Sequence, residues 1–455
     1  MKNLLRSFAA GSLLALLAAC GGGSDTRATG GNTGGAPSGP GSPAPSAELP
    51  VIYITTAGGV PVLNTEDYVN ATVTVLAANG EQLLQAPTEV RGRGNTTWGM
   101  PKKPYRLKLN QAASMLGMPA ERDWNLLANY ADKSLARNKL AMELGEELGF
   151  SYTPRSVFAE MYFNGEYQGV YQVFEHVKVG PNRVNIEKLD RRTDSDPSII
   201  TGGHFLEIDH RFDEDVCWLT SMNVPICSKD PEYDADDAAT PGHPSNLQFN
   251  YIRDYVNAAE ASLSARNNSY VDYFDVDSTV NFYLLNELLK TNDAQINSYV
   301  EGSDRFTSSV FLHKQRGGKL TFGPLWDFDI AAGNINYNGN DDPEGWWIRN
   351  GEWHRLLFNN TDFGERVHAR WCTLVRNGTI AGLDERVDGI AAGMDRDAVD
   401  RNFERWDILG TYVWPNSYVG ETYDDEVDYL KDWMTRRANW MNNALVAEFG
   451  ACPAN

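Results

Sequence analysis

The sequence predicts an α+β fold with a sheet-rich N-terminal lobe and a mostly helical C-terminal lobe. Strand-like runs of β-branched and aromatic residues fill most of the segment 49–178. An Asn-Gly pair in that segment lies between two aromatic-rich runs, which is a strong signal for a β-hairpin. In the segment 179–455 the apolar residues recur mainly at helical spacing.

The first strands are predicted where β-branched residues gather between turn residues. The stretch "VIYITT" (51–56) opens the folded part, and "ATVTVLA" (71–77) and "TEVRGRGNTTW" (88–98) follow it. In "PYRLKLN" (104–110) apolar side chains alternate with basic ones, as expected of a half-buried strand. These four stretches supply the sheet of the N-terminal lobe.

One helix and one hairpin complete the predicted N-terminal lobe. Residues 132–150 predict a helix, because Asp132 stands at an N-cap position, leucines follow at helical spacing and Gly149 provides a stop. The hairpin covers residues 156–177, with Asn164-Gly165 at its turn.

The C-terminal lobe is predicted to mix a few strands with many helices. A strand is expected within 202–212, and the acidic, proline-containing stretch 213–245 is expected to be a loop. The remaining elements are predicted in this order: helices at 246–264 and 276–290, a hairpin-like pair within 309–329, and helices near 352–376, 384–407 and 425–449.

Length and composition suit a large globular body. The chain has 455 residues, of which 42% are hydrophobic, which is enough for a sizeable core in one large domain or two lobes. The formal net charge of −21 argues against non-specific binding to nucleic acid, which requires a basic face.

The N-terminus carries the pattern of an export signal. Lys2 and Arg6 precede an apolar run that is too short to span a bilayer, so residues 1–19 are predicted to be a signal peptide. The run ends in "LAAC" at Cys20, which resembles the bacterial lipobox, in which cleavage leaves a lipidated cysteine. A plain secretory signal that happens to contain a cysteine is the alternative.

The next segment is predicted to be a tether. Residues 20–48 are rich in Gly, Ser and Pro and contain almost nothing to bury. A lipid anchor, a tether and a folded body together predict a lipoprotein of the bacterial cell envelope, at the outer membrane or the cell surface. It would meet the membrane only through its N-terminal lipid, since no later stretch is long and apolar enough for a membrane-spanning helix.

Four cysteines remain after Cys20: Cys217, Cys227, Cys372 and Cys452. An even number in an exported protein favours disulfides. Proximity in the sequence suggests Cys217–Cys227 and Cys372–Cys452, although three connectivities are possible. Zinc is not favoured, because neither C-x-x-C pairs nor a suitable histidine spacing accompanies these cysteines.

The first stretch that could carry chemistry is "RGRGNTTWGMPKKPYRLKL" (91–109). Its glycines allow the backbone to approach a ligand closely, and successive N–H groups of such a loop can surround phosphate. Lys103 and Lys108 follow, and an ammonium group commonly binds phosphate. The alternative is an ordinary glycine-containing turn followed by solvated lysines.

The second stretch is "NELLKTNDAQINSY" (286–299), where a helix is predicted to end near Lys290. Asp293 lies just beyond that end, and Asn297 follows four residues later. An Asp followed shortly by an Asn is typical of a protein-kinase catalytic loop, in which the Asp accepts the hydroxyl proton and the Asn binds Mg²⁺. The alternative is a polar junction between a helix and a loop.

The third stretch is "GPLWDFDIAAG" (323–333), which contains Asp327 and Asp329. On an extended strand these two carboxylates would point to the same side and favour a bound cation. Asp-Phe-Asp resembles the kinase D-F-G motif and lies 34 residues after Asp293. The alternatives are the D-x-D motif of haloacid-dehalogenase phosphatases and an Asp pair that caps a surface turn. The Asn- and Asp-rich stretch 334–345 is predicted to be a loop flanking this site.

Taken in order, these stretches resemble the spore-coat protein H (CotH) family of kinase-like proteins. The resemblance covers roughly residues 85–380, and six pieces occur in the family's order. They are "RGRGNTTWGMPKKPYRLKL", "WNLLANYADKSLARNKLAMELGEELG", "YFNGEYQGVYQVFEHV", "TGGHFLEID", "LLNELLKTNDA" with "GKLTFGPLWDFDIAAGN", and "WHRLLFNNTDFGERVHARW".

The resemblance implies an atypical, two-lobed protein-kinase-like fold with lobes at 49–178 and 179–455. It also implies transfer of the ATP γ-phosphate to Ser or Thr of a protein in the envelope or at the cell surface, with Mg²⁺ or Mn²⁺ as the metal. Asp293 would be the catalytic Asp, and Asp327, Asp329 and Asn297 would be metal ligands.

The resemblance further implies a set of residues for the nucleotide phosphates, namely Arg93, Gly94, Asn95, Lys103 and Lys108. Glu143, on the predicted helix 132–150, would pair with one of the two lysines, as kinases pair a strand Lys with a helix Glu. Glu146 and Glu147 are alternatives for this role. The alternative function is a non-catalytic envelope or surface protein that uses the same scaffold for adhesion or assembly. A metal-dependent phosphatase is a third class.

Overall fold

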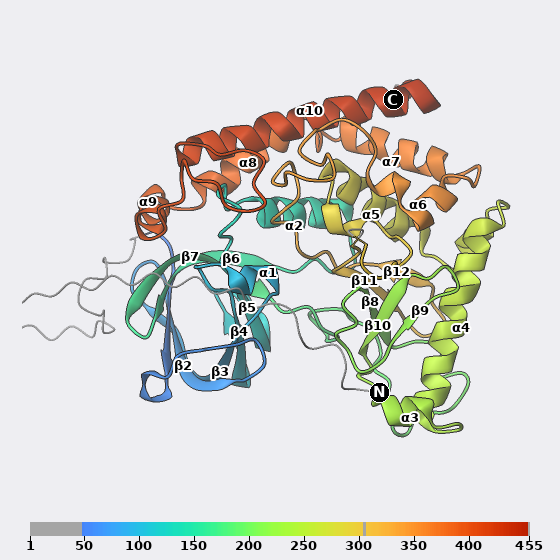
Figure 1. Ribbon diagram of the computed structural model, residues 1–455, viewed down its shortest axis with the longest axis horizontal. Helices are drawn as coiled ribbons and strands as arrows, with labels where there is room; N and C mark the ends of the chain where they lie inside the picture. Colours follow the sequence, from blue (N-terminus) through green and yellow to red (C-terminus); the bar gives the residue numbers. More distant parts are fainter. Residues whose placement is uncertain (1–47, 304–305, 454–455) are drawn as a thin grey trace, which may run out of the picture. The chain divides into compact units, whose positions relative to one another are not determined.

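The computed structural model describes residues 48–303 and 306–453, all within the unit Ser38–Asn455 (Figure 1). The predicted signal peptide, the lipidation site Cys20 and the predicted tether up to residue 47 lie outside the described residues. The described part is a mixed α+β structure, sheet-rich at its N-terminal side and helical at its C-terminal side, as the sequence predicts. Its likeness to a protein kinase stays a prediction.

Seven strands of the N-terminal lobe close into a β-barrel, whereas the sequence predicted only a sheet-rich lobe. The ring runs in the order β1-β2-β3-β4-β5-β7-β6, and parallel pairing of β1 with β6 closes it. Alternate side chains of the strands fill the interior of the barrel. Because the sheet is closed, it has no free edge strand. The strands are β1 (Val51–Thr56), β2 (Val69–Leu76), β3 (Gln82–Gly92), β4 (Tyr105–Met115), β5 (Met118–Leu127), β6 (Ser156–Phe163) and β7 (Glu166–Glu175).

The strand predicted over residues 88–98 is wrong beyond Gly92, where β3 ends. Gly94 has a φ of 79°, in the left-handed region, and this takes the chain out of the strand. The chain then forms the short helix α1 (Thr96–Gly99) before it enters β4. The 3-10 turn η1 (Ala57–Gly59) follows β1 in the same lobe.

The main helix of this lobe, α2 (Arg137–Leu148), begins five residues later than predicted. The Asp132 carboxylate accepts the backbone N–H of Arg137 at 2.9 Å, so it does bond to the helix start across a turn. Leu135, which lies between Asp132 and Arg137, has a φ of 58° and therefore does not adopt a helical conformation. Gly149 ends the helix as predicted, with a φ of 83° and its N–H bonded to the carbonyls of Gly145 and Glu146.

A second sheet of five strands lies in the C-terminal lobe, in the order β12-β11-β8-β10-β9. The predicted loop at 213–245 is wrong, because it contains two of these strands and a short helix. Strands β9 and β10 place Cys217 opposite Cys227, and the predicted disulfide joins them. The elements are β8 (His204–Ile208), β9 (Cys217–Leu219), β10 (Pro225–Asp230), α3 (Ala235–Ala239), α4 (Pro244–Ser264), α5 (Val276–Leu288), β11 (Val310–Lys314) and β12 (Leu320–Phe322), with 3-10 turns η2 (Ser269–Asp272) and η3 (Asn292–Ala294).

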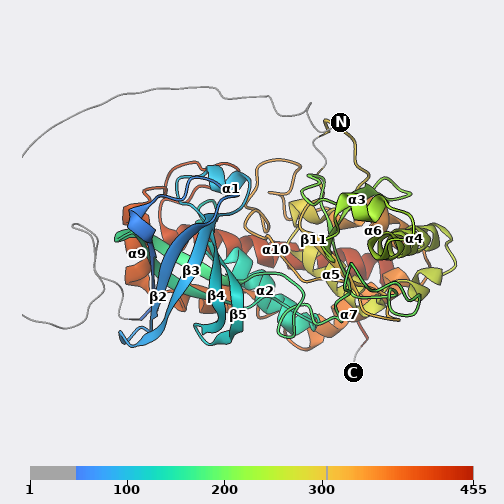
Figure 2. The same ribbon diagram turned by 90° about the horizontal axis from the view of Figure 1, so that it is seen from below.

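The rest of the C-terminal lobe is helical, and the long helix α10 runs along α8, α5 and α7 (Figures 1 and 2). The second predicted disulfide, Cys372–Cys452, ties α7 to the chain just past α10. Among residues 48–303 and 306–453, no helix combines the length and apolar character needed to cross a lipid bilayer. The helices are η4 (Ile348–Asn350), α6 (Glu352–Leu357), α7 (Phe363–Arg376), α8 (Leu383–Ala392), α9 (Arg396–Arg405) and α10 (Tyr423–Phe449).

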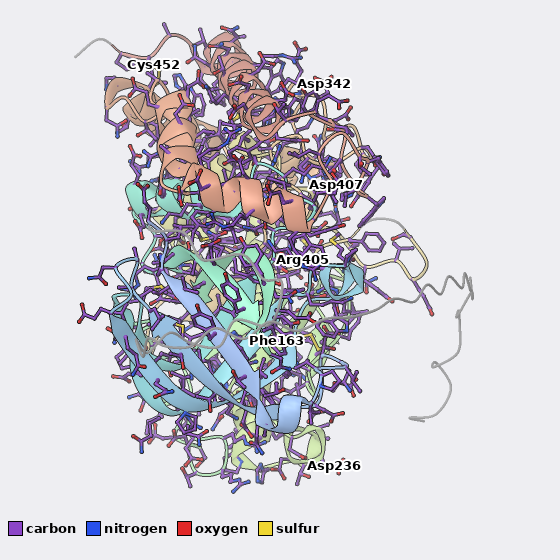
Figure 3. All side chains as sticks on the ribbon, turned by 90° about the vertical axis from the view of Figure 1, so that its left-hand side faces the viewer. Phe163, Asp236, Asp342, Arg405, Asp407 and Cys452 are labelled. Atoms are coloured by element: carbon purple, nitrogen blue, oxygen red, sulfur yellow. A yellow bond between two sulfur atoms is a disulfide. The ribbon has the colours of Figure 1, made fainter. Side chains whose placement is uncertain are left out.

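Helix α9 packs on the barrel and joins the two lobes. Lys102 lies just before β4. Its buried ammonium group donates to the carbonyl of Val170 at 2.6 Å and to Asn402 Oδ1 of α9 at 2.8 Å. Arg405 Nε donates to the carbonyl of Tyr167 in β7 at 3.0 Å. Figure 3 shows Arg405 at this junction, above the barrel. These bonds fix the barrel against α9 of the C-terminal lobe, the lobe that carries the acids described next.

Candidate functional site

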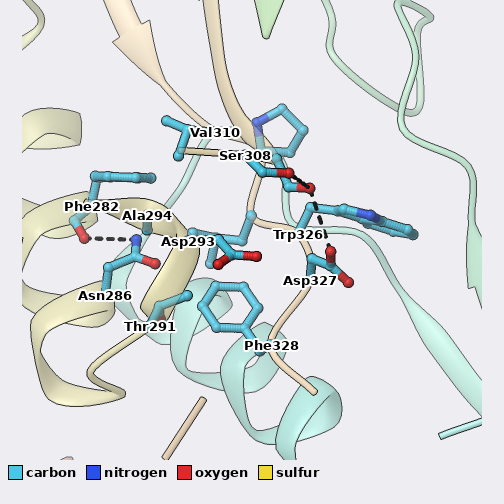
Figure 4. A pocket seen from close by; sticks show the side chains of 13 residues that line it. Phe282, Asn286, Thr291, Asp293, Ala294, Ser308, Val310, Trp326, Asp327 and Phe328 are labelled. Carbon is cyan, nitrogen blue, oxygen red and sulfur yellow. Dashed lines mark hydrogen bonds between the residues drawn. The ribbon is translucent and has the colours of Figure 1, made fainter. Parts of the chain in front are cut away.

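Three aspartates from two separate segments converge in the C-terminal lobe. Asp293 follows α5, and Asp327 and Asp329 follow β12. Asp293 and Asp327 line one small pocket, which also contains Ser308, Ser309 and aromatic side chains (Figure 4). Asp327 is exposed, while Asp293 and Asp329 are half-buried. The predicted catalytic Asp and Asp327, one of the predicted metal ligands, therefore line the same pocket.

The backbone that presents Asp327 and Asp329 is not the extended strand that the sequence predicted. Strand β12 ends at Phe322, and Asp327 has a φ of 69°, which is uncommon for a residue other than glycine. The N–H of Phe328 donates to Asn138 Oδ1 of α2 at 2.9 Å, and the Phe328 ring is buried. Burial of Phe328 and its bond to α2 fix the turn, so that the two carboxylates differ in exposure.

Mutual repulsion of the acids is evident in their pKa values. Burial raises the pKa of Asp329 to about 8, and the charges of Asp327, Asp132 and Asp293 add to this effect. Burial also raises the pKa of Asp293 to about 6, with Asp327 contributing, although a hydrogen bond from Asn292 acts in the opposite direction. Carboxylates that raise one another's pKa form a site with unbalanced negative charge. A cation would relieve that charge.

A network of asparagines holds Asp293 in place. Asn292 Nδ2 donates to Asp293 Oδ1 at 2.6 Å, and Asn292 Oδ1 accepts from Asn338 Nδ2 at 2.9 Å and from Asn340 Nδ2 at 3.2 Å. The N–H of Ser308 donates to the Asp293 carbonyl at 3.0 Å. The predicted loop 334–345 thus flanks the acidic site and orients one of its members.

The start of α2 supports the segment that follows Asp329. Arg137 Nε donates to the Ala331 carbonyl at 3.0 Å, and Arg137 Nη2 donates to the Ala332 carbonyl at 3.3 Å. Asn334 Nδ2 donates to the Asp329 carbonyl at 2.7 Å. These contacts fix the backbone at Asp329 and in the residues that follow it.

The glycine-rich loop of the barrel reaches the same site. Arg93 lies over the Trp326 ring, with its guanidinium carbon 5.2 Å from the ring centroid. Burial lowers the pKa of Arg93, and the nearby negative charges of Asp327 and Asp329 oppose that shift. Gly94 is required in this loop, because a Cβ there would lie 2.1 Å from Thr97 Oγ1.

The two lysines predicted to bind phosphate point elsewhere. Lys103 Nζ donates to the Trp98 carbonyl at 2.7 Å, and Lys108 Nζ lies 5.7 Å from the centroid of the Tyr68 ring. The predicted pairing of either lysine with Glu143 is wrong. Glu143 lies on the side of α2 that faces α8, where it pairs with Lys139 and Arg386, each at 3.6 Å.

Asn297 is buried near the same pocket but hydrogen-bonds elsewhere. Its Nδ2 donates to Gln295 Oε1 at 2.9 Å and to the Gln295 carbonyl at 3.1 Å, and its backbone N–H donates to Thr307 Oγ1 at 3.2 Å. Its role as a metal ligand stays a prediction.

Sequence reasoning missed Arg106, a cation of β4 that lies between the two lysines. Arg106 Nη2 forms an ion pair with Asp123 at 3.0 Å, and its positive charge lowers the pKa of Arg93. Its Nε–H is buried and has no hydrogen-bond partner among the described residues. The alternation of β4 already placed Arg106 on the same outward face as Lys108, so the pattern could have identified it.

Two further residues were missed because no motif marks them. Asp132 contributes to the raised pKa of Asp329 from the loop before α2. Arg211, in the loop after β8, lowers the pKa of Asp293. Both belong to loops that only the tertiary fold brings to the acids.

The site combines three acids of the C-terminal lobe with a glycine-rich loop of the barrel that carries Arg93. It is therefore a carboxylate centre with a cationic loop beside it. Comparison with protein families matches residues 90–441 to the family described as CotH kinase protein. The chain belongs to this family. The site residues Arg93, Asp293, Asp327 and Asp329 all lie within the matched segment.

A curated protein also resembles part of the chain. This chain is 35% identical to the inner spore coat protein H of Bacillus subtilis (strain 168) over 89 residues, which cover 20% of this chain. The aligned part amounts to 24% of that protein, so the chain spans about a quarter of the length of this curated relative.

Proposed function

We propose that this chain is a protein kinase of the CotH type that transfers the γ-phosphate of ATP to Ser or Thr of a protein in the envelope or at the cell surface. The observation that carries the proposal is the meeting of Asp293, Asp327, Asp329 and Arg93 at one site between two lobes. Family membership, over residues 90–441, supports the same chemistry.

The acids suit a divalent metal ion such as Mg²⁺ or Mn²⁺. These ions prefer oxygen ligands, and Mg²⁺ is commonly held by one or two carboxylates together with substrate phosphates. Asp327 and Asp329 supply the carboxylates. Burial and the charges of the neighbouring acids raise the pKa of Asp329, and a bound cation would oppose that shift. When bound, such an ion neutralises charge on the transferred phosphoryl group.

Asp293 would act on the acceptor hydroxyl. With a pKa of about 6, its carboxylate is mostly ionised at neutral pH and can accept a proton from Ser or Thr. Asn292 holds this carboxylate by a hydrogen bond to Oδ1, and the Ser308 N–H holds the backbone carbonyl of Asp293. A general base requires such positioning. Phosphoryl transfer depends mainly on positioning and charge stabilisation, so a rigid Asp at this place is appropriate.

Arginines of the barrel would bind the phosphates in place of the predicted lysines. Arg93 lies over Trp326, next to Asp327, and Arg106 has a buried Nε–H with no hydrogen-bond partner among the described residues. A guanidinium can donate two parallel hydrogen bonds to a phosphate, which a lysine ammonium cannot. The geometry therefore favours Arg93 and Arg106 over Lys103 and Lys108.

Metal-dependent nucleotide binding tests this proposal. Thermal melting of the purified chain is measured with Mg²⁺ alone, ATP alone and both together, for the wild type and for Asp327→Asn. We expect both ligands together to raise the melting temperature of the wild type more than either alone, and Asp327→Asn to lose that gain. Absence of any shift in the wild type would favour the non-catalytic adhesion or assembly protein.

We further propose that the chain is exported and lipid-anchored through Cys20, which lies outside the described residues. The name of the curated relative places that protein in a spore coat, which is also a surface structure. Metabolic labelling with a radioactive fatty acid tests the anchor. We expect label on the wild type in the membrane fraction and none on Cys20→Ser. An unlabelled wild-type chain would overturn the anchor but leave the kinase proposal untouched.

A further inference from the structure

Arg211 lies between the acidic site and the second sheet, in the loop that follows β8. Its Nη1 forms an ion pair with Asp209 Oδ2 at 2.7 Å, and its backbone N–H donates to Asp209 Oδ1 at 2.8 Å. A carboxylate that binds both the backbone and the side chain of one residue fixes that side chain strongly. Asp209 thus holds the guanidinium through Nη1.

The Nε edge of Arg211 meets the glycine-rich loop of the other lobe. In the amide orientation that satisfies both groups, Asn95 Oδ1 accepts from Arg211 Nε at 2.9 Å and from Nη1 at 3.3 Å. Asn95 precedes α1 at the N-cap position, where asparagine commonly bonds to the helix backbone, yet its side chain makes no such bond. The Asn95 amide is instead committed to a residue of the C-terminal lobe.

Arg211 is also linked to the aspartate that we propose as the base. Asp209 Oδ2, its ion-pair partner, accepts from Ser308 Oγ at 3.3 Å, and the Ser308 N–H donates to the Asp293 carbonyl at 3.0 Å. The positive charge of Arg211 acts on the Asp293 carboxylate as well. One guanidinium therefore connects the glycine-rich loop of the barrel with the segment around the acids.

The remaining backbone bonds of the loop stay within the barrel lobe. The Gly92 N–H donates to the Asn64 carbonyl at 3.0 Å, and the Arg93 N–H donates to the Pro104 carbonyl at 3.2 Å. These bonds fix the base of the loop but not its tip. Across to the other lobe, the described contacts of the loop are the stacking of Arg93 on Trp326 and the bond of Asn95 to Arg211.

We infer that Arg211 is a positioning residue that holds the tip of the glycine-rich loop over the acidic site, so that Arg93 faces Asp327 and Asp329. The role in catalysis rests on the proposed kinase function. The contact itself belongs to the free protein and can be tested without nucleotide.

Hydrogen exchange of the free protein tests the contact. Backbone exchange of residues 93–97 is followed by mass spectrometry in the wild type, Arg211→Ala, Asn95→Ala and the double variant. We expect each single variant to speed exchange there by about tenfold, since a charge-assisted hydrogen bond is lost, and the double variant to add little. Arg253→Ala, which removes an exposed pair with Asp254 on α4, is the matched control and leaves exchange unchanged.

Unchanged exchange of residues 93–97 in Arg211→Ala would overturn the inference, and so would additive effects in the double variant. If the wild type proves to be active, steady-state kinetics give a second readout. We expect Arg211→Ala to raise KM for ATP by about tenfold and to change kcat less, with Arg211→Lys intermediate. A lowered kcat at unchanged KM would contradict a positioning role. A wild type without activity would refute the proposed function but leave the exchange result to decide on the contact.

Discussion

Asp132 and Arg137 form a nearly fully buried ion pair, with Arg137 Nη1 2.6 Å from Asp132 Oδ1. The same guanidinium donates to the carbonyls of Ala331 and Ala332, which follow the acids of the site. One pair thus joins the start of α2 to the segment that carries Asp327 and Asp329. Loss of the Arg137 side chain leaves the buried Asp132 carboxylate without its ion-pair partner and releases that segment.

We therefore expect Arg137→Met to be strongly destabilising. Breaking one partner of a buried ion pair typically costs roughly 3–5 kcal/mol, because the remaining charge is left uncompensated. Urea unfolding measures the change. Arg366→Met, which removes a partly exposed pair with Asp362, is the control and should cost less than about 1 kcal/mol. Equal effects of the two variants would contradict this account of the α2 support.

The glycine-rich loop is expected to tolerate alanine at one glycine and not at another. At Gly94 the φ is 79° and a Cβ would lie 2.1 Å from Thr97 Oγ1, whereas at Gly99 a Cβ would meet nothing within 4 Å. Placing a residue with a Cβ in the left-handed region costs roughly 1–2 kcal/mol before any clash. Gly94→Ala should lower the affinity for ATP with Mg²⁺, as measured by calorimetry, and Gly99→Ala should not. Equal affinities of both variants would show that the loop does not meet the nucleotide.

Arg106 and Lys108 are neighbours on one face of β4, and we expect them to differ in function. Arg106 lies near Arg93 and has a buried N–H without a partner among the described residues, while Lys108 lies against Tyr68. Arg106→Met should weaken ATP binding by about tenfold, because a charge-assisted hydrogen bond to phosphate is lost. Lys108→Met should leave the calorimetric affinity within about twofold. The opposite order would restore the lysine assignment made from the sequence.

His354 is predicted to make stability depend on pH. It is fully buried among aromatic rings, and its ring nitrogens have no hydrogen-bond partner among the described residues. Burial lowers its pKa to about 3, whereas in the unfolded chain it titrates near 6.5. Between these values only the unfolded state binds the proton, so stability falls as the pH falls, by about 1.4 kcal/mol per pH unit.

His354→Phe removes this titration and suits the apolar surroundings. We expect the free energy of unfolding of the variant, relative to that of the wild type, to rise as the pH falls from about 6 to 4. The expected rise is about 1.4 kcal/mol for each pH unit. Urea unfolding at pH 7, 6, 5 and 4 measures the difference. A difference that does not vary with pH would mean that His354 binds a proton in the folded state.

Much of the fold could be predicted from local patterns. The strand β1, the hairpin of β6 and β7, the end of α2 at Gly149 and both disulfides follow from residues close in the sequence or from cysteine spacing. Closure of the barrel could not be predicted, because it depends on parallel pairing of β1 with β6, which lie more than 100 residues apart. The strands within 213–245 were hidden, because that acidic stretch owes its order to the Cys217–Cys227 bond and to pairing with β8.

The candidate site could likewise be predicted only in part. Asp293, Asp327 and the loop at 93–95 occur in recognisable motifs, and the structure brings them together. Arg93 was among the residues predicted for phosphate and lies near the acids. The sequence could not separate Arg106 from Lys103 and Lys108, because the fold of the barrel decides where each of these side chains points. Glu143 was assigned by analogy to a helix face, but α8 lies on that face and supplies Arg386 as its partner. Arg211 and Asp132 are reached only through tertiary contacts.

Transfer of phosphate from radiolabelled ATP tests the central claim most directly. The purified chain is incubated with Mg²⁺ or Mn²⁺ and envelope proteins, beside Asp293→Asn, Asp327→Asn and the control Arg253→Ala. We predict label on Ser or Thr with the wild type and the control, and a loss of roughly 100-fold or more in both aspartate variants. If the wild type transfers no more label than Asp293→Asn, although it binds ATP with metal, the chain is not a kinase. Release of phosphate from phosphoprotein without ATP would indicate a phosphatase instead.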